Sequence, residues 1–377
     1  MTIEIRTVRS KSELKTFIRF NYELYKHNPY SVPDLLEDMM NTFSPEKNPA
    51  FEFCEAEYFL AYREGKLVGR VAAIINHRAN ETWCKKAVRF GWIDFIDDAE
   101  VSEALINAVK KWGRERNMES IEGPLGFTDF DAEGMLIEGF EEVSTMATIY
   151  NFPYYPQHLE RLGFTPVADW VEKKIYIPEE VPAKHLRISK IVSEKYNLRT
   201  VKPTSKKEIQ RSGLGHEIFH LLNEAYAPLF GFSKMSDKQI DHYVKTFLPL
   251  VDLRMVSMVM NDKDELVAVG LSMVSLSEAL QKAKGKLWPF GWWHLLKALF
   301  IKRPKVLDLL LVAVRPDYQG TGANALLFTD LIPVYKKLGF EYAESNPELA
   351  DNDKVQGQWS YFRTEQHKRR RCFGAAL

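Results

Sequence analysis

The sequence lacks several features that would point directly to a class of protein. It has only 3 cysteines, which are too scattered for metal-ligand or redox spacing: Cys54, Cys84 and Cys372. Such cysteines are typical of isolated thiols in a reducing compartment. Its 51 basic and 51 acidic residues balance to a formal net charge of +0, whereas a dedicated nucleic-acid-binding domain is normally distinctly basic. We therefore expect no metal and no nucleic-acid partner.

Long apolar runs are also absent. No stretch is apolar for long enough to cross a bilayer, and residues 1–6 carry no apolar signal core. We expect a cytoplasmic protein without a membrane partner. Its 377 residues are more than one compact core usually holds, so two domains are expected.

The order of predicted elements occurs twice along the chain. In the first half, apolar patterns predict strand, helix, three strands, helix and strand at residues 3–8, 14–25, 56–62, 67–75, 88–96, 102–116 and 120–123. The second half repeats this order with strands at 198–201, 255–260, 266–274 and 306–314, a helix at 325–338 and a strand at 341–346. The pattern predicts a duplicated α/β fold with a linker around residues 177–197.

A glycine-containing loop follows the β-branched and Leu-rich run from Val306 to Val314. Gly320 and Gly322 permit backbone angles closed to other residues, and a helix is predicted from Ala325. Several N–H groups can then converge on an anion at the positive end of that helix. The loop therefore predicts a pyrophosphate site.

The loop resembles the acyl-coenzyme-A loop of the GNAT acetyltransferase superfamily. That pattern is Val-x-Pro-x-Tyr-Arg/Gln-Gly-x-Gly-x-Gly/Ala, and six positions are in register: Val314, Pro316, Tyr318, Gln319, Gly320 and Gly322. Asn324 departs from the Gly or Ala of the family. The resemblance implies two tandem GNAT-like α/β domains, each with a mixed, mostly antiparallel sheet flanked by helices. Residues 1–180 would form a domain without a coenzyme-A loop, and residues 195–377 an acyl-coenzyme-A-binding domain with an aromatic helical insertion at about 276–303.

The resemblance also implies a cosubstrate, acetyl-CoA or another acyl-CoA. Its binding residues would be Val312, Val314, Gln319, Gly320, Thr321, Gly322, Ala323, Asn324 and Asn352. A strand N–H near Val312–Val314 would stabilise the negative carbonyl oxygen of the transition state. The first copy has Asp97-Asp98-Ala99-Glu100 at the corresponding helix start, where carboxylates cap the helix and repel a pyrophosphate. We therefore expect one coenzyme A per chain.

Acyl transfer to an amine requires the amine to lose a proton. Asp308 and Glu344 are the candidate bases, with edge exposure or a salt bridge as the alternative interpretation of each. In the family, a Tyr seven positions after an Asn protonates the thiolate. Counting from Asn352 gives Trp359, so Tyr361 is the candidate acid, with a place in an aromatic core as its alternative.

These features predict an N-acyltransferase, specifically an N-acetyltransferase, that acts on a small-molecule or peptide amine. One alternative is a GNAT-fold binding module without catalysis. Another is a long-chain N-acyltransferase, for which the aromatic insertion is the only indication. The acceptor, the acyl length and the oligomeric state are left open by the sequence.

The insertion is rich in tryptophan. Its predicted helix places Trp292, Leu295, Leu296 and Leu299 on one face, and we expect that face to pack between the two copies. The alternatives are a lid over an apolar substrate and a membrane-surface contact aided by nearby lysines and an arginine. The basic run His367–Arg371 is expected to be a solvated strand or tail.

Overall fold

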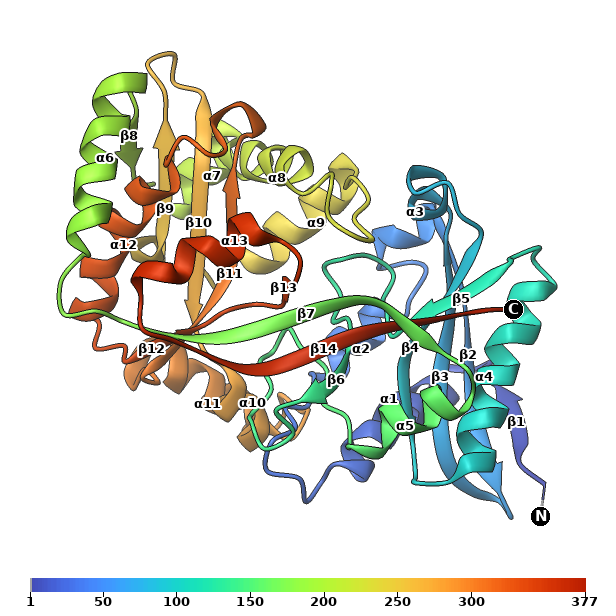
Figure 1. The fold of residues 1–377 in the computed structure, drawn as a ribbon. Coiled ribbons are helices and arrows are strands. Elements are labelled where there is room, and N and C mark those ends of the chain that lie inside the picture. The colour runs from blue at the N-terminus through green and yellow to red at the C-terminus, as the bar shows by residue number, and fades with distance from the viewer. Residues whose placement is uncertain (1) are drawn as a thin grey trace. The chain divides into compact units, whose positions relative to one another are not determined.

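The computed structural model describes residues 2–377, which form two compact units (Figure 1). Unit 1 comprises the chain up to Val171, together with Leu276–Lys297 and His367–Leu377. Unit 2 comprises Glu172–Ser275 and Ala298–Gln366. The division therefore differs from the expected domains of residues 1–180 and 195–377, because most of the insertion, Leu276–Lys297, and most of the last strand, from His367 onward, belong to unit 1.

Unit 1 is an α/β layer built on strands β1 to β5. Its N-terminal elements are β1 (Glu4–Thr7), α1 (Lys11–Leu24), α2 (Leu36–Thr42), β2 (Cys54–Arg63), β3 (Lys66–Asn76), α3 (His77–Thr82), β4 (Ala87–Phe95), α4 (Ala99–Arg114), β5 (Ser120–Gly123), β6 (Met135–Glu138) and α5 (Tyr154–Arg161). Strands β1 to β4 are antiparallel neighbours, and β4 pairs with β5 in parallel. Helix α4 packs on β3 and β4 and buries Leu105 and Val109 completely.

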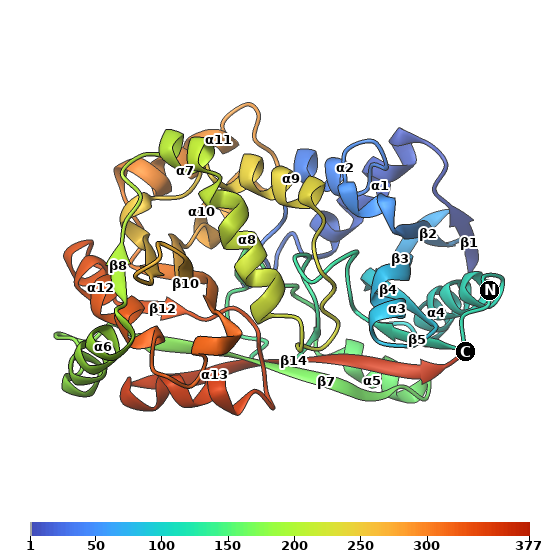
Figure 2. The same cartoon turned by 90° about the horizontal axis from the view of Figure 1, so that it is seen from above.

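Unit 2 repeats this arrangement. Strand β7 (Thr165–Tyr176) passes from unit 1 into unit 2 after Val171. It leads into α6 (Ala183–Tyr196), β8 (Arg199–Val201), α7 (Lys206–Ser212), α8 (Leu214–Ala225), α9 (Asp237–Phe247), β9 (Val256–Met260), β10 (Leu266–Val274), β11 (Val306–Val314), α12 (Asn324–Lys337), β12 (Tyr342–Glu344), β13 (Glu348–Leu349) and α13 (Asp353–Gln358). The sheet order is β8-β9-β10-β11-β12-β7, with β11 and β12 parallel and the other neighbours antiparallel. Helices α6 and α12 pack together on one face, and α8 covers the other (Figures 1 and 2).

The predicted fold class is confirmed: each unit has a mixed, mostly antiparallel sheet flanked by helices. The predicted bounds of β5, β10 and β11 agree with the structure. The expected linker at residues 177–197 is wrong over most of its length, because it contains α6, which buries Val192 in unit 2. None of the helices formed by residues 2–377 combines the length and apolar character needed to span a membrane.

The insertion contains α10 (Ser277–Ala283) and α11 (Gly291–Leu296), followed by a π-helical turn at Lys297–Ile301. Its base is bonded within unit 1: the Gln281 amide donates to the carbonyls of Pro29 and Ser31, at 2.8 and 3.0 Å. The expected burial of an apolar helix face is wrong, since Trp292 and Leu296 are 38% and 39% exposed.

The basic run His367–Arg371 lies within strand β14 (Thr364–Ala376) and is not solvated as expected. Lys368 and Arg370 are 1% and 0% exposed. Lys368 donates to the carbonyl of Val143 (3.1 Å), and Arg370 donates to the carbonyl of Ile149. Carbonyls distant in sequence therefore help to make burial of these cations tolerable. The flanking Arg369 and Arg371 bind the carboxylate of Asp169.

Candidate active site

Strands β11 and β12 are paired over a short stretch only and then diverge. Their parallel register ends at the pair Asp308 and Glu344, where β12 stops, while β11 continues to Val314. On the opposite side of β11, Leu271 pairs with Leu311 but Ser272 pairs with Leu309. Leu310 is thus the extra residue of a β-bulge, a feature that bends a strand and re-aims its groups. The result is an open edge of β11 from about Leu309 onward.

Side chains show which peptide groups face this open edge. The carbonyls of Leu310, Val312 and Val314 accept hydrogen bonds from Asn346 Nδ2 (2.9 Å), the Tyr226 hydroxyl (3.0 Å) and Gln319 Nε2 (3.1 Å). These carbonyls therefore point away from β10. Because the N–H and C=O of one strand residue lie on the same side, the N–H groups of Val312 and Val314 also face the open edge, where an extended ligand could pair with them.

The loop after β11 presents more N–H groups. Gly320 and Gly322 have φ of +76° and +93°, and α12 begins at Asn324 after its N-cap Ala323. Within residues 2–377, the amides of Gly320, Gly322, Ala323 and Asn324 make no backbone hydrogen bond, whereas Thr321 N is bonded to Tyr318 O. Four such donors at the positive end of a 14-residue helix suit an anion.

The two glycines differ in what surrounds them. A Cβ on Gly322 would lie 2.7 Å from Ile188 Cγ2 and 3.4 Å from Val192 Cγ2, both on α6. A Cβ on Gly320 would meet nothing within 4 Å. Gly322 is therefore required for packing of the loop against α6, while Gly320 lies in open space.

An apolar pocket of about 40 Å³ lies between the sheet of unit 2 and α12. Its lining includes Leu309, Val312, Phe328, Leu331, Trp359 and Phe362. Tyr335 also lines it, but its hydroxyl is bonded to Ser272 Oγ at 2.7 Å. This volume holds roughly three water-sized groups, so an unbranched apolar chain can begin to enter beside the open edge.

Glu348 is an acidic residue that the sequence interpretation missed. Its carboxylate accepts hydrogen bonds from Trp359 Nε1 (2.9 and 3.1 Å) and Gln356 Nε2 (3.1 Å). Burial raises the pKa of Glu348 to about 7, although these hydrogen bonds and the charge of Lys173 act in the opposite direction. Its charge also contributes to raising the pKa of Tyr226, the residue bonded to Val312. A carboxyl with a pKa near working pH is suited to general base catalysis.

The candidate bases Asp308 and Glu344 are brought together, as register partners on adjacent parallel strands. They are 1% and 5% exposed, which excludes the alternative of edge exposure. Tyr361, the candidate acid, is 46% exposed and its hydroxyl is hydrogen bonded to Lys184, which lowers the pKa of Tyr361. Asn352 caps α13 through Val355 N (3.3 Å). Neither Tyr361 nor Asn352 lines the apolar pocket.

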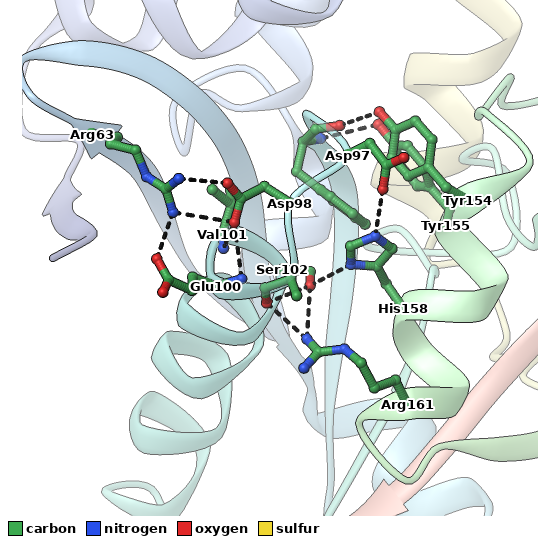
Figure 3. A network of polar contacts seen from close by, with 12 residues as sticks. Arg63, Asp97, Asp98, Glu100, Val101, Ser102, Tyr154, Tyr155, His158 and Arg161 are labelled. Atoms are coloured by element: carbon green, nitrogen blue, oxygen red, sulfur yellow. Dashed lines mark hydrogen bonds and ion pairs between the residues drawn. The ribbon is translucent and has the colours of Figure 1, made fainter. Parts of the chain in front are cut away.

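The corresponding helix start in unit 1 is already occupied by carboxylates (Figure 3). Asp98 caps α4 by accepting from the amides of Glu100 and Val101, at 3.0 and 3.3 Å. Arg63 binds Asp98 through two contacts of 2.6 and 3.1 Å and binds Glu100 at 2.6 Å. The N–H groups that a phosphate would need are thus engaged by Asp98, as the sequence predicts.

A Ser-His-Asp chain lies beside this cap (Figure 3). His158 Nε2 contacts Asp97 Oδ1 at 2.9 Å, and its Nδ1 contacts Ser102 Oγ at 2.7 Å. Ser102 is 0% exposed and also bonds the carbonyl of Ala99, so no substrate can reach it. This chain ties α5 to α4 and is structural.

Comparisons with known proteins bear on the fold. A tandem GNAT protein from the clavulanic acid biosynthesis pathway covers 99% of this chain and 98% of its own, with a TM-score of 0.56 and 12% identity. The chain has the tandem GNAT fold. A GCN5-related N-acetyltransferase from Sphaerobacter thermophilus has the same fold, with a TM-score of 0.53, 12% identity and coverage of 99% and 95% of the two chains. The predicted GNAT resemblance is therefore confirmed at the level of fold.

Two curated proteins are similar in sequence. Protein YghO of Escherichia coli is 26% identical over 376 residues, which cover 98% of this chain and 94% of that protein. The bacterial ceramide synthase of Caulobacter vibrioides is 26% identical over 328 residues, or 86% and 84% of the two chains. No protein-family model matches the chain.

Proposed function

We propose that the protein is an acyl-CoA-dependent N-acyltransferase and that unit 2 binds the acyl-CoA. The observations that carry this proposal are the N–H groups of Val312 and Val314 at the open edge and the loop amides of Gly320, Gly322, Ala323 and Asn324, which make no backbone hydrogen bond within residues 2–377. Together they could pair with the amides of an extended chain and bind the phosphates at its end. The tandem GNAT fold supports the same assignment by analogy.

The residues fit acyl-CoA in three places. The amides of Gly320, Gly322, Ala323 and Asn324 would hold the pyrophosphate, with Gln319 and Thr321 shaping the loop through their bonds to Val314 and Tyr318. The open edge would orient the pantetheine amides, and a strand N–H near Val312 would stabilise the carbonyl oxygen as it becomes negative. Asn352 remains a predicted contact.

In the reaction, the amine nitrogen bonds to the thioester carbon and the carbon–sulfur bond breaks. The proton lost by the amine goes to a base, and the departing thiolate gains a proton. We assign the base to Glu348, because its carboxylate is bonded to Trp359, which lines the apolar pocket, and because burial raises its pKa to about 7. Glu344 and Asp308 stay as predicted alternatives for this role, and Tyr361 as the predicted acid.

The length of the acyl chain is a second question, and two observations favour a chain longer than acetyl. The pocket beside the open edge is lined by aliphatic and aromatic side chains. One similar protein is named a bacterial ceramide synthase, and a ceramide is the amide of a fatty acid with a long-chain amino alcohol. We therefore propose long-chain acyl transfer as the preferred form of the activity, with acetyl transfer as its alternative.

The test is to supply acetyl-CoA and palmitoyl-CoA with a short polyamine, a peptide amine and a long-chain amino alcohol. The N-acyl product is then measured by mass spectrometry, because Cys84 is exposed and would consume thiol reagents. Product with palmitoyl-CoA and little with acetyl-CoA supports the long-chain form. Binding of both donors without product from any amine would instead support the binding-module alternative.

A further inference from the structure

Unit 1 presents a group of exposed aromatic and aliphatic side chains, here called the aromatic tip. Its members and their exposed fractions are Trp288 (74%), Phe290 (73%), Trp292 (38%), Trp293 (46%) and Leu296 (39%). Scattered exposed apolar residues are normal, but five large ones within nine residues are not, and such patches mark interaction surfaces.

The aromatic tip is a folded platform. A Cβ on Gly291 would lie 1.7 Å from the carbonyl oxygen of Lys286, so this loop closes only because residue 291 is glycine. Trp292 Nε1 donates to the carbonyl of Pro289 (2.9 Å), and the Leu36 amide donates to the carbonyl of Gly285 (2.9 Å). The backbone is held at both ends of the loop while the side chains project outward.

The charges within the tip itself are positive. Residues 279–297 contain 4 lysines and no aspartate or glutamate, in a chain whose formal net charge is +0. Lys282 pairs with Glu278 at the base of the insertion, and Glu37 and Asp38 follow Leu36, whose amide is bonded to Gly285. Lys284, Lys286 and Lys297 are exposed, and no acidic group within residues 2–377 forms an ion pair with them.

Three tryptophans and a phenylalanine beside three exposed lysines that form no ion pair match the chemistry of an anionic lipid surface. Aromatic rings favour the headgroup level of a bilayer, and each nearby lysine adds attraction to acidic lipids. A second copy of this chain is a poorer match, since the tip offers no acid for the lysines of its partner. We propose that the aromatic tip docks the protein on a membrane surface that contains anionic lipids.

This proposal does not depend on acyl transfer. If both proposals hold, the enzyme works at a lipid surface, where long-chain donors and amines concentrate.

Vesicle flotation tests the proposal with the full chain. We expect the protein to float with vesicles of phosphatidylcholine mixed with phosphatidylglycerol, to float poorly with phosphatidylcholine alone, and to be released by salt. Trp288→Ser with Phe290→Ser should abolish flotation. The matched control is Leu186→Ser with Ile191→Ser, because both residues are 52% exposed on α6, and it should float like the parent.

A charge variant tests the electrostatic contribution to membrane binding. Lys286→Glu with Lys297→Glu should weaken binding by more than about tenfold, since each lysine near an acidic surface contributes about fivefold. Lys11→Glu with Lys15→Glu on α1 makes the same charge change elsewhere and should have little effect. Failure of the parent to float, or equal binding by the tip variants, would overturn the proposal. So would a dimer in solution that the Trp288 and Phe290 substitutions dissolve. None of these results would alter the proposed acyl transfer, which is tested separately by formation of the N-acyl product without vesicles.

Discussion

Replacing Glu348 by glutamine is the substitution that best separates catalysis from binding. Glutamine keeps the size of the side chain, and its oxygen can still accept the hydrogen bond from Trp359 Nε1 that Glu348 accepts at 2.9 Å. It cannot accept a proton. If Glu348 is the base, turnover should fall by about a hundred- to ten-thousandfold while CoA affinity stays within about twofold of the parent.

The pH profile identifies the group responsible. The base acts when it is ionised, so parental kcat/KM should rise with pH through about 7, the pKa of Glu348, and then level off. Glu348→Gln should lose this rise.

The pH dependence of the free energy of unfolding gives a second, independent measure of the raised pKa of Glu348. Between pH 4.5 and about 7 the folded protein retains the Glu348 proton that the unfolded chain has released. Parental stability should therefore fall as pH rises across this window, by about 3 kcal/mol at roughly 1.4 kcal/mol per pH unit, and should stay level above it. In Glu348→Gln this contribution should vanish, which makes the variant relatively more stable at pH 8 than at pH 4.5.

Product formation by mass spectrometry and urea unfolding at several pH values measure the two effects. The reasoning is refuted if Glu348→Gln turns over at the parental rate with an unchanged pH profile. A variant that loses activity together with CoA binding would point to a structural role for Glu348 instead.

Three further predictions concern the cosubstrate and the other candidate residues. Gly320→Asp should weaken CoA binding by at least about tenfold in titration calorimetry, because the carboxylate repels the phosphates. Two controls should bind CoA within about twofold of the parent. They are Gly320→Asn, whose side chain has the shape of aspartate without its charge, and Gly339→Asp, at a glycine with nearly the same φ as Gly320 and equally open space around it. Titration should also give one CoA per chain, and Asp98→Asn in unit 1 should leave that number and the affinity unchanged; two sites would contradict the occupied cap of α4. CoA binding should be retained in each of three variants, Asp308→Asn, Glu344→Gln and Tyr361→Phe. A variant that loses turnover by about a hundredfold or more, together with one limb of the pH profile, identifies a proton-transfer residue. A variant that loses only stability toward urea identifies a structural residue.

The structure also changes the choice of test at Gly322. From sequence, a valine at this position is expected to occupy the phosphate site. A side chain there would instead strike Ile188 on α6, so the substitution would disturb packing and confuse binding with stability.

Much of unit 2 could be predicted because its signals are local. The apolar run of β11, the glycines and the start of α12 are adjacent in sequence, and together they predict that Gln319–Asn324 lie in one loop. The carboxylate cap of α4 by Asp98 is likewise a signal contained within four residues, Asp98 to Val101.

Features that depend on distant partners could not be predicted in this way. The raised pKa of Glu348 requires its burial in the folded chain, and the bulge at Leu310 requires the register of β10. Lys368 and Arg370 look like solvated residues until β14 is placed in unit 1. The insertion is amphipathic by helical spacing, but its helix has only six residues before the π turn. Leu295 and Leu299 are half-buried, while Trp292 and Leu296 on the same predicted face stay exposed.

The central claim is that acyl-CoA bound in unit 2 gives its acyl group to an amine. The most direct measurement is mass spectrometry of isotopically labelled palmitoyl-CoA incubated with a long-chain amino alcohol and either the parent or Gly320→Asp. The account predicts that labelled amide and free CoA form in equal amounts with the parent and that both fall at least about tenfold with Gly320→Asp under subsaturating donor. Free CoA and labelled palmitate without amide, or equal amide formation by the two proteins, would contradict it.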